Sequence, residues 1–316
     1  MRKSWVVGVL VGFLLLGACG DPSSEPESVP PERSASGTSA AKAPAVSPSS
    51  TTQQQRPPAS AVPAAPEAPA KPPTVLYLGD SLAMENQKVL GGLLRDELKA
   101  RYTSAPYSGT TLCDYLEGTG EDSLVPAEDK AAALVRSLRP DFVVLQFWGN
   151  AWGYTPCMDG ITHDKAEAEY FARYAADARR LTEQIADAGD GDGPKVVWVL
   201  QGPDPITPDR VRRVNAIYEQ QADASGDLLA DAGKAVSSAT ARYTWTQYLP
   251  CTAYERDHPA YCTEPGSGRT ALHRDDDYLH FCLAPTTEKS RPCPVRSPGI
   301  LRIGQAITTA LTAATN

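Results

Sequence analysis

Two short stretches at opposite ends of the chain carry residue types suited to nucleophilic chemistry. Ser81 lies in Gly79-Asp80-Ser81-Leu82, and His280 ends Asp277-Tyr278-Leu279-His280. A serine hydroxyl becomes a nucleophile when a histidine accepts its proton, and that histidine needs a third group to orient its ring. Asp277 is the candidate for this third group because it precedes His280 by three residues in the same segment.

Few other residues could serve as a base or bind a cation. The chain has only four histidines; we expect His163 to be a helix cap or a surface residue, and His258 and His273 to lie in a solvent-exposed loop. Asp275 or Asp276 could orient His280 in place of Asp277, or the two could form a weak cation site. We favour solvated side chains for both, and the proposed chemistry requires neither a metal nor a cofactor.

Runs of apolar residues predict a parallel β-sheet. Val75–Leu78, Phe142–Phe147 and Val196–Leu200 are apolar without alternation, as is typical of strands covered on both faces. Two weaker strands are predicted near Arg101–Ala105 and Leu228–Ala230. Strands that alternate with helical patterns indicate a doubly wound α/β fold.

Apolar residues at helical spacing separate these strands. One helix follows Ser81, a second covers Tyr170 to Ile185, a third begins at Thr207-Pro208-Asp209 and the last opens at Ser297-Pro298. We therefore predict that residues 74–316 form one domain, a three-layer α/β/α sandwich with a five-stranded parallel sheet.

The predicted position of Ser81 favours chemistry. A serine directly after the first strand lies at the carboxyl edge of the sheet, where open α/β folds bind ligands. It also lies at the start of a helix, whose free N–H groups and positive end stabilise an oxyanion. Gly79 leaves the backbone room for the tight turn. The alternative is that Gly-Asp-Ser only caps the helix.

The N-terminus has the pattern of an export signal. Met1-Arg2-Lys3 precedes an apolar stretch from Trp5 to Leu16, which is too short to span a membrane. Leu16-Gly17-Ala18-Cys19 resembles the lipobox of bacterial lipoproteins, which implies a signal peptide at 1–18, a lipid on Cys19 and anchoring to the outer face of the cell membrane. An uncleaved anchor or an N-terminal core helix is the alternative.

Composition separates a linker from the folded part and excludes one class of partner. Residues 20–73 hold 13 of the prolines and no aromatic residue, so that 19–73 is expected to be a lipidated cysteine followed by a disordered linker. The net charge of −8 argues against nucleic-acid binding, which needs clustered Lys and Arg. Apart from the lipid anchor no membrane contact is expected, and we expect a monomer.

The cysteine count supports export. Of seven cysteines, six remain once Cys19 is set aside, and in an exported protein six cysteines suggest three disulfides. Fifteen pairings are possible. We favour Cys251–Cys262 and Cys282–Cys293, which each close a short loop that contains proline, and this leaves Cys113–Cys157.

These stretches resemble the motifs of the SGNH (GDSL) hydrolase superfamily, which has a flavodoxin-like α/β/α fold. Gly79-Asp80-Ser81-Leu82 and Asp277-x-x-His280 match its first and last motifs. Gly109 matches the second, and Asn150, in Trp148-Gly149-Asn150-Ala151, matches the Asn of the third. Around Asn150 the chain departs from the family, since Trp148 takes the usual glycine position and Ala151 replaces Asp.

The resemblance implies a serine esterase. A Ser81–His280–Asp277 triad would transfer an acyl group, while the N–H groups of Ser81 and Gly109 and the Asn150 amide form the oxyanion hole. The expected substrate is a small ester or an acylated glycan, such as an O-acetyl or short-chain ester of the cell envelope.

Several alternatives to this function remain open from the sequence. Within acyl transfer they are a lipid esterase or lipase, or an O-acyltransferase; outside it, an envelope-binding lipoprotein on the same fold that has lost its activity. Trp148 and Trp152 flank Asn150 and either stack on a substrate or pack in the core.

Overall fold

The computed structural model describes residues 71–315 except 120, 152–154, 192, 241 and 286–290. The predicted signal peptide, Cys19 and nearly all of the linker therefore lie outside the described residues. At the centre of the described part is a five-stranded parallel sheet in the order β2-β1-β3-β4-β5. Its strands are β1 (Thr74–Gly79), β2 (Arg101–Ser104), β3 (Phe142–Gln146), β4 (Lys195–Val199) and β5 (Leu228–Ala230). All five predicted strands are confirmed, and the order is that of the flavodoxin-like doubly wound fold.

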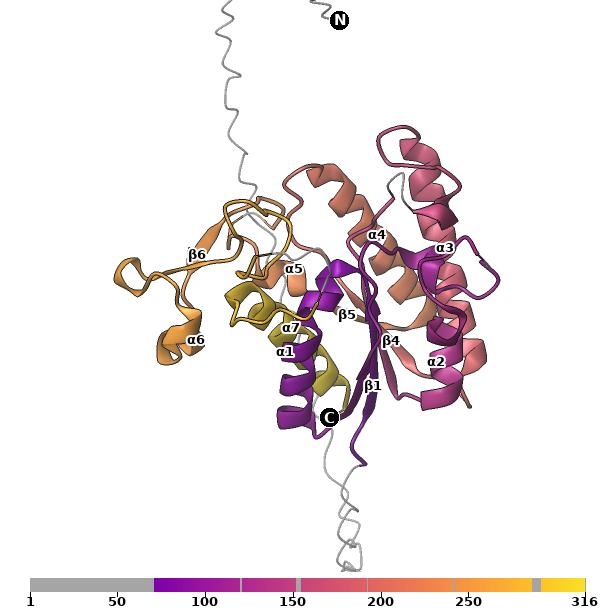
Figure 1. Ribbon diagram of the computed structural model, residues 1–316. Coiled ribbons are helices and arrows are strands. Elements are labelled where there is room, and N and C mark those ends of the chain that lie inside the picture. The colour runs from indigo at the N-terminus through magenta and orange to yellow at the C-terminus, as the bar shows by residue number, and fades with distance from the viewer. Residues whose placement is uncertain are drawn as a thin grey trace, which may run out of the picture. The chain divides into compact units, whose positions relative to one another are not determined.

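Helices cover both faces of this sheet (Figure 1). The helices α1, α5 and α7 lie on one face, and α2, α3 and α4 lie on the other. Their bounds are α1 (Ser81–Leu98), α2 (Ala131–Leu138), α3 (Glu167–Ala188), α4 (Pro208–Ser225), α5 (Ala232–Ala235) and α7 (Pro298–Thr315). This arrangement confirms the predicted three-layer sandwich. No helix in the described part of the chain is long and apolar enough to cross a membrane.

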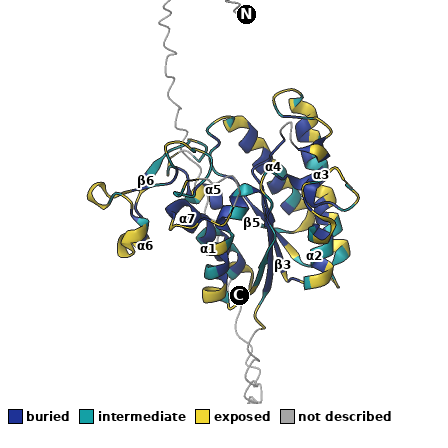
Figure 2. Cartoon of the chain, in the orientation of Figure 1, coloured by how far each residue is buried: buried dark blue, intermediate teal, exposed yellow. Residues whose placement is uncertain are grey.

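The core explains why the strands lack an apolar–polar alternation. Successive side chains of a strand point to opposite faces. Leu76 and Leu78 pack into the core under α2, α3 and α4, whereas Val75 and Tyr77 pack under α1 and α7. Both sets are fully buried, and Figure 2 shows the strands buried on both faces of the sheet.

A smaller substructure, which the sequence did not predict, projects beside α5 and α7 (Figure 1). It contains an antiparallel hairpin of β6 (Tyr248–Pro250) and β7 (Arg269–Ala271), with the short helix α6 (Ala253–Asp257) between the two strands. The segments are three to five residues long, which is too short for periodicity to identify. The short helix α2 was not predicted either.

Three disulfides join the pairs that the sequence favoured: Cys113–Cys157, Cys251–Cys262 and Cys282–Cys293. The first links the 3₁₀ helix Leu112–Tyr115 to the 3₁₀ helix Pro156–Met158. It therefore connects the segment after β2 to the segment after β3, both at the carboxyl edge of the sheet.

Candidate active site

Ser81 begins α1 immediately after β1, at the carboxyl edge of the sheet. Asp80 is the N-cap, and its buried carboxylate accepts the Leu82 N–H at 3.0 Å. Gly79 is required here, since a Cβ at this residue would lie 2.0 Å from the Gln146 carbonyl oxygen. The Gly-Asp-Ser sequence thus caps the helix and also places the Ser81 hydroxyl at the sheet edge.

The structure brings Ser81, His280 and Asp277 into one hydrogen-bonded chain. The Ser81 Oγ lies 3.0 Å from His280 Nε2, although the two residues are 199 positions apart in the sequence. On the other side of the ring, His280 Nδ1 lies 3.1 and 3.0 Å from the two Asp277 oxygens. This is the geometry in which a carboxylate holds the imidazole tautomer whose free Nε2 can accept a hydroxyl proton.

Hydrogen bonds to its backbone hold the segment that carries Asp277 and His280. Asp277 Oδ1 accepts the N–H groups of Leu279 and His280, at 3.3 and 3.1 Å. The Tyr278 carbonyl accepts the indole N–H of Trp245 at 3.0 Å. The carboxylate therefore orients both the ring and the backbone of the histidine.

His273 corrects an expectation from the sequence. It is 4% exposed instead of solvated, and its Nδ1 lies 3.0 Å from the His280 carbonyl oxygen. Burial lowers its pKa to about 4, so the ring is neutral at neutral pH and its Nδ1–H donates to that carbonyl. His273 therefore holds the backbone of His280 through this hydrogen bond.

The other acidic neighbours and histidines have separate surroundings. Asp275 accepts from the Gln247 amide, and Asp276 pairs with Arg274, so Asp277 alone of the three aspartates bonds the His280 ring. His258 is exposed, as predicted. His163 does not cap a helix but packs edge-on against aromatic rings of α3. Among the described residues, no cluster of His, Cys, Asp and Glu could hold a metal ion.

The charges around His280 favour its protonated form. Burial lowers its pKa, but the hydrogen bond to Asp277 and the negative charges of Glu85, Asp277 and Asp80 outweigh burial, so the pKa lies above 6.5. Burial raises the pKa of Asp277, but the hydrogen bonds and the charge of His280 outweigh burial and hold this pKa well below its usual range. Asp277 is thus charged whenever an imidazolium forms beside it. No motif or spacing in the sequence pointed to Glu85.

Asp80 also joins Ser81 to the segment after β3. Its Oδ2 accepts the Trp148 N–H at 2.6 Å and the Asn150 side-chain amide at 3.2 Å. The same amide donates to the Thr110 carbonyl at 3.0 Å, directly after Gly109, which has a φ of 79°. The structure therefore brings the three predicted oxyanion segments together.

An amide nitrogen carries two hydrogens, and the two contacts of Asn150 with Asp80 and the Thr110 carbonyl occupy both. Donation from Asn150 to an oxyanion requires that it exchange one of these partners. Its place in the oxyanion hole stays a prediction.

A buried cation organises the unusual loop before Asn150. The Arg210 guanidinium lies 3.6 Å from the centre of the Trp148 ring and donates to the Gly149 carbonyl at 3.1 Å. Asp204 neutralises this cation at 2.8 Å, with both side chains buried. Trp148 is only 4% exposed, so it packs in the core, where it also lines a small cavity with Leu82 and Leu279. Trp152 lies outside the described residues.

Comparison with known proteins gives distant likenesses only. No protein-family model and no curated protein matches the chain. Among solved structures, it is similar to a carbohydrate esterase family 2 enzyme of Corynascus thermopiles (Myceliophthora fergusii), at 16% identity, 79% coverage of this chain, 68% of that one and a TM-score of 0.44. It is also similar to the family 3 carbohydrate esterase of Clostridium thermocellum, at 11% identity, 78% coverage of this chain, 98% of that one and a TM-score of 0.41. A third similar structure is the catalytic domain of peptidoglycan O-acetyltransferase A from Streptococcus pneumoniae, at 12% identity, 77% coverage of this chain, 94% of that one and a TM-score of 0.38.

The strand order, with Ser81 after β1 and His280 before α7, is the arrangement that the sequence resemblance implies. The chain has a flavodoxin-like three-layer α/β/α fold, which agrees with its resemblance to SGNH hydrolases. Because the identities and TM-scores are low, the function of this chain has to be argued from its own site.

Replacing Asp277 tests the electrostatics of this site. Asp277→Asn removes the charge that favours the imidazolium, and we expect kcat for an aryl acetate to fall by roughly 10³–10⁴. The acid limb of kcat/KM reports the pKa of His280, which these contacts raise, and it should move to lower pH in this variant. Asp275→Asn is the matched control and should change neither quantity. Equal effects of the two substitutions would contradict the assignment of Asp277.

Proposed function

We propose that the protein is a serine esterase that uses Ser81 as nucleophile, His280 as general base and Asp277 as the group that orients it. The observation that carries this proposal is the 3.0 Å contact between Ser81 Oγ and His280 Nε2. An inactive binding protein has no need of this contact, nor of the carboxylate on the far side of the ring.

The chemistry proceeds in two transfers. Ser81 Oγ bonds to the ester carbonyl carbon as its proton moves to His280 Nε2, and the carbonyl π electrons move to the oxygen. Collapse breaks the bond to the alcohol, which leaves with the proton from His280. A water molecule then attacks the acyl-enzyme and loses a proton to His280. Collapse of this second intermediate breaks the bond between the acyl carbon and Ser81 Oγ, which takes the proton back from His280 as the acid leaves.

The oxyanion of each intermediate is stabilised by hydrogen-bond donors that already point toward it. The Ser81 N–H at the start of α1 and the Gly109 N–H are two of them in this proposal. Asn150 is the third, and it exchanges its bond to Asp80 or to the Thr110 carbonyl for one to the oxyanion. Each such donor is worth about 3 kcal/mol in the transition state.

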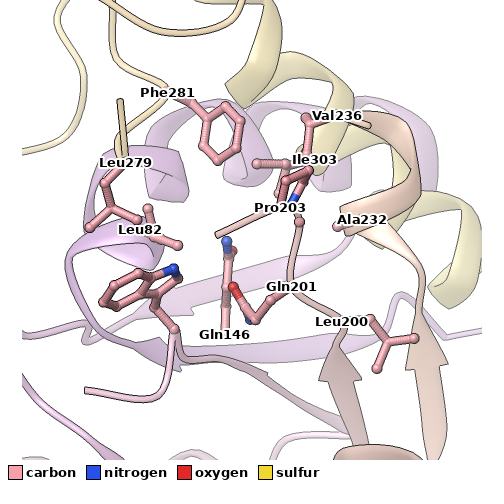
Figure 3. Close-up of a pocket in the computed structure, with 13 residues that line it drawn as sticks. Leu82, Gln146, Leu200, Gln201, Pro203, Ala232, Val236, Leu279, Phe281 and Ile303 are labelled. Carbon is pink, nitrogen blue, oxygen red and sulfur yellow. The ribbon is translucent and has the colours of Figure 1, made fainter. Parts of the chain in front are cut away.

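A small cavity lined by sequence neighbours of Ser81 and His280 is the candidate site for the acyl group. It is lined by Leu82 and Leu279, the sequence neighbours of Ser81 and His280, and by Val236, among others. Figure 3 shows these apolar side chains around a narrow space. The cavity volume is about 10 Å³, about the space of one water molecule. A space of this size does not admit a lipid chain, which favours a short acyl group such as acetyl.

Water can reach the base, as hydrolysis of the acyl-enzyme requires. The His280 side chain is 26% exposed and that of Asp277 is 19% exposed. Together with the lipid attachment predicted at Cys19, these features support an enzyme that removes O-acetyl groups from small esters or glycans of the cell envelope.

Covalent labelling tests the nucleophile. An organophosphate should add to Ser81 and abolish aryl acetate hydrolysis, and Ser81→Ala should neither be labelled nor turn over. The matched control is Ser137→Ala, which removes an exposed hydroxyl on α2 and should behave as the parent protein. Mass spectrometry of the labelled peptide identifies the site; full activity of Ser81→Ala would refute the proposal.

A series of aryl esters tests the acyl class. We expect kcat/KM to fall at least about tenfold from acetyl to butyryl, as for methylenes that a pocket cannot hold. Val236→Ala enlarges the cavity and should reduce this preference, whereas Val295→Ala, at an exposed valine, should not. A kcat/KM that rises with chain length would favour the lipid esterase instead.

A further inference from the structure

Glu85 is a buried carboxylate that the proposed chemistry does not yet use. It lies one helical turn after Ser81 on α1 and is 5% exposed. Its Oε1 accepts the Phe281 N–H at 2.9 Å, and its Oε2 accepts the Cys282 N–H at 3.1 Å. Each carboxylate oxygen thus holds one backbone N–H of the two residues that follow His280.

The backbone of Glu85 holds the same segment at a second point. Its carbonyl accepts the Cys293 N–H at 3.1 Å, and Cys293 forms a disulfide with Cys282. Both half-cystines are therefore hydrogen-bonded to one residue of α1. Because Ser81 begins the same helix, the nucleophile and the support of the histidine segment belong to one rigid element.

The two buried carboxylates at the start of α1, Asp80 and Glu85, bond different segments of the site. Asp80 bonds the N–H groups of Leu82 and Trp148 and the amide of Asn150, on the oxyanion side. The Glu85 carboxylate bonds only the segment after His280 among the described contacts.

We propose that Glu85 is a positioning residue for His280: it fixes the backbone next to the imidazole relative to Ser81, and its negative charge stabilises the imidazolium formed during acyl transfer. This inference rests on the proposed esterase function and deepens it, because it names a second carboxylate besides Asp277 that acts on the base.

Four titratable groups face His280 besides the Ser81 hydroxyl. They are Asp277 on its own segment, Asp80 and Glu85 at the start of α1, and His273 after β7. The three carboxylates raise the pKa of His280, whereas His273, which burial keeps neutral, adds no charge. Burial raises the pKa of Glu85 to about 7, so Glu85 is about half ionised at neutral pH and becomes fully charged at higher pH, where a neutral His280 acts as the base.

The variant Glu85→Gln distinguishes a role of Glu85 in positioning His280 from a role only in the stability of the fold. Glutamine keeps the shape but loses the charge, and it offers one acceptor where two N–H groups need one each. We expect kcat for an aryl acetate to fall about tenfold to a hundredfold, as for a slightly misplaced catalytic group, with KM within about twofold. The pKa of the acid limb of kcat/KM should fall by about one unit, the effect of losing one nearby opposite charge.

Two further variants complete the test. Glu85→Asp keeps the charge on a shorter side chain, so that kcat should fall while the pKa of the acid limb stays near that of the parent protein. This variant also tests the role of Glu85 if Glu85→Gln fails to fold. Glu255→Gln is the matched control, because Glu255 is equally buried but bonds Arg302 and the Thr252 N–H. It should lower thermal stability without moving the acid limb.

The outcomes distinguish the two proposals. A parent protein that neither hydrolyses esters nor reacts at Ser81 overturns the esterase function. An active parent with an unchanged acid limb in Glu85→Gln, whether or not stability falls, overturns the role of Glu85 alone. A lowered acid limb in Glu85→Gln that Glu85→Asp restores supports it.

Discussion

The site depends on one contact, the hydrogen bond that joins Ser81 Oγ to His280 Nε2 across 199 positions of sequence. Parallel strands place their carboxyl ends at one edge of a sheet, and α1 and the segment before α7 both lie there. The contact between α1 and α7 on the same face of the sheet keeps the two ends of the domain together. The fold therefore positions the hydroxyl and the imidazole before any substrate binds.

Buried negative charge then determines how this contact behaves. Burial raises the pKa of Asp80 to about 6 and that of Glu85 to about 7, because a carboxylate loses its hydration in the interior. Backbone N–H groups and the imidazole compensate for part of that loss. The same charges, with Asp277, favour the imidazolium, so that the groups that shape the segments also assist the proton transfer.

The sequence predicted the parts of this arrangement that depend on local pattern. The apolar strands, Gly79-Asp80-Ser81 and the spacing of Asp277 and His280 are properties of short segments, and all are found where the sheet topology requires them. Burial of single polar residues was not predictable from local pattern. His273 is covered by Trp245 and Phe281, and the segment after His280 bonds to Glu85, so both depend on contacts between distant parts of the chain. The partners of Asn150 likewise depend on contacts between three loops.

The most direct test of the account is a crystal structure of the protein after reaction with an organophosphate. The account predicts a phosphorus atom bonded to Ser81 Oγ, with one phosphoryl oxygen within hydrogen-bond distance of the Gly109 N–H and of an Asn150 amide that has left Asp80 or the Thr110 carbonyl. An adduct on another residue, or a phosphoryl oxygen that faces solvent while Asn150 keeps both partners, would contradict it.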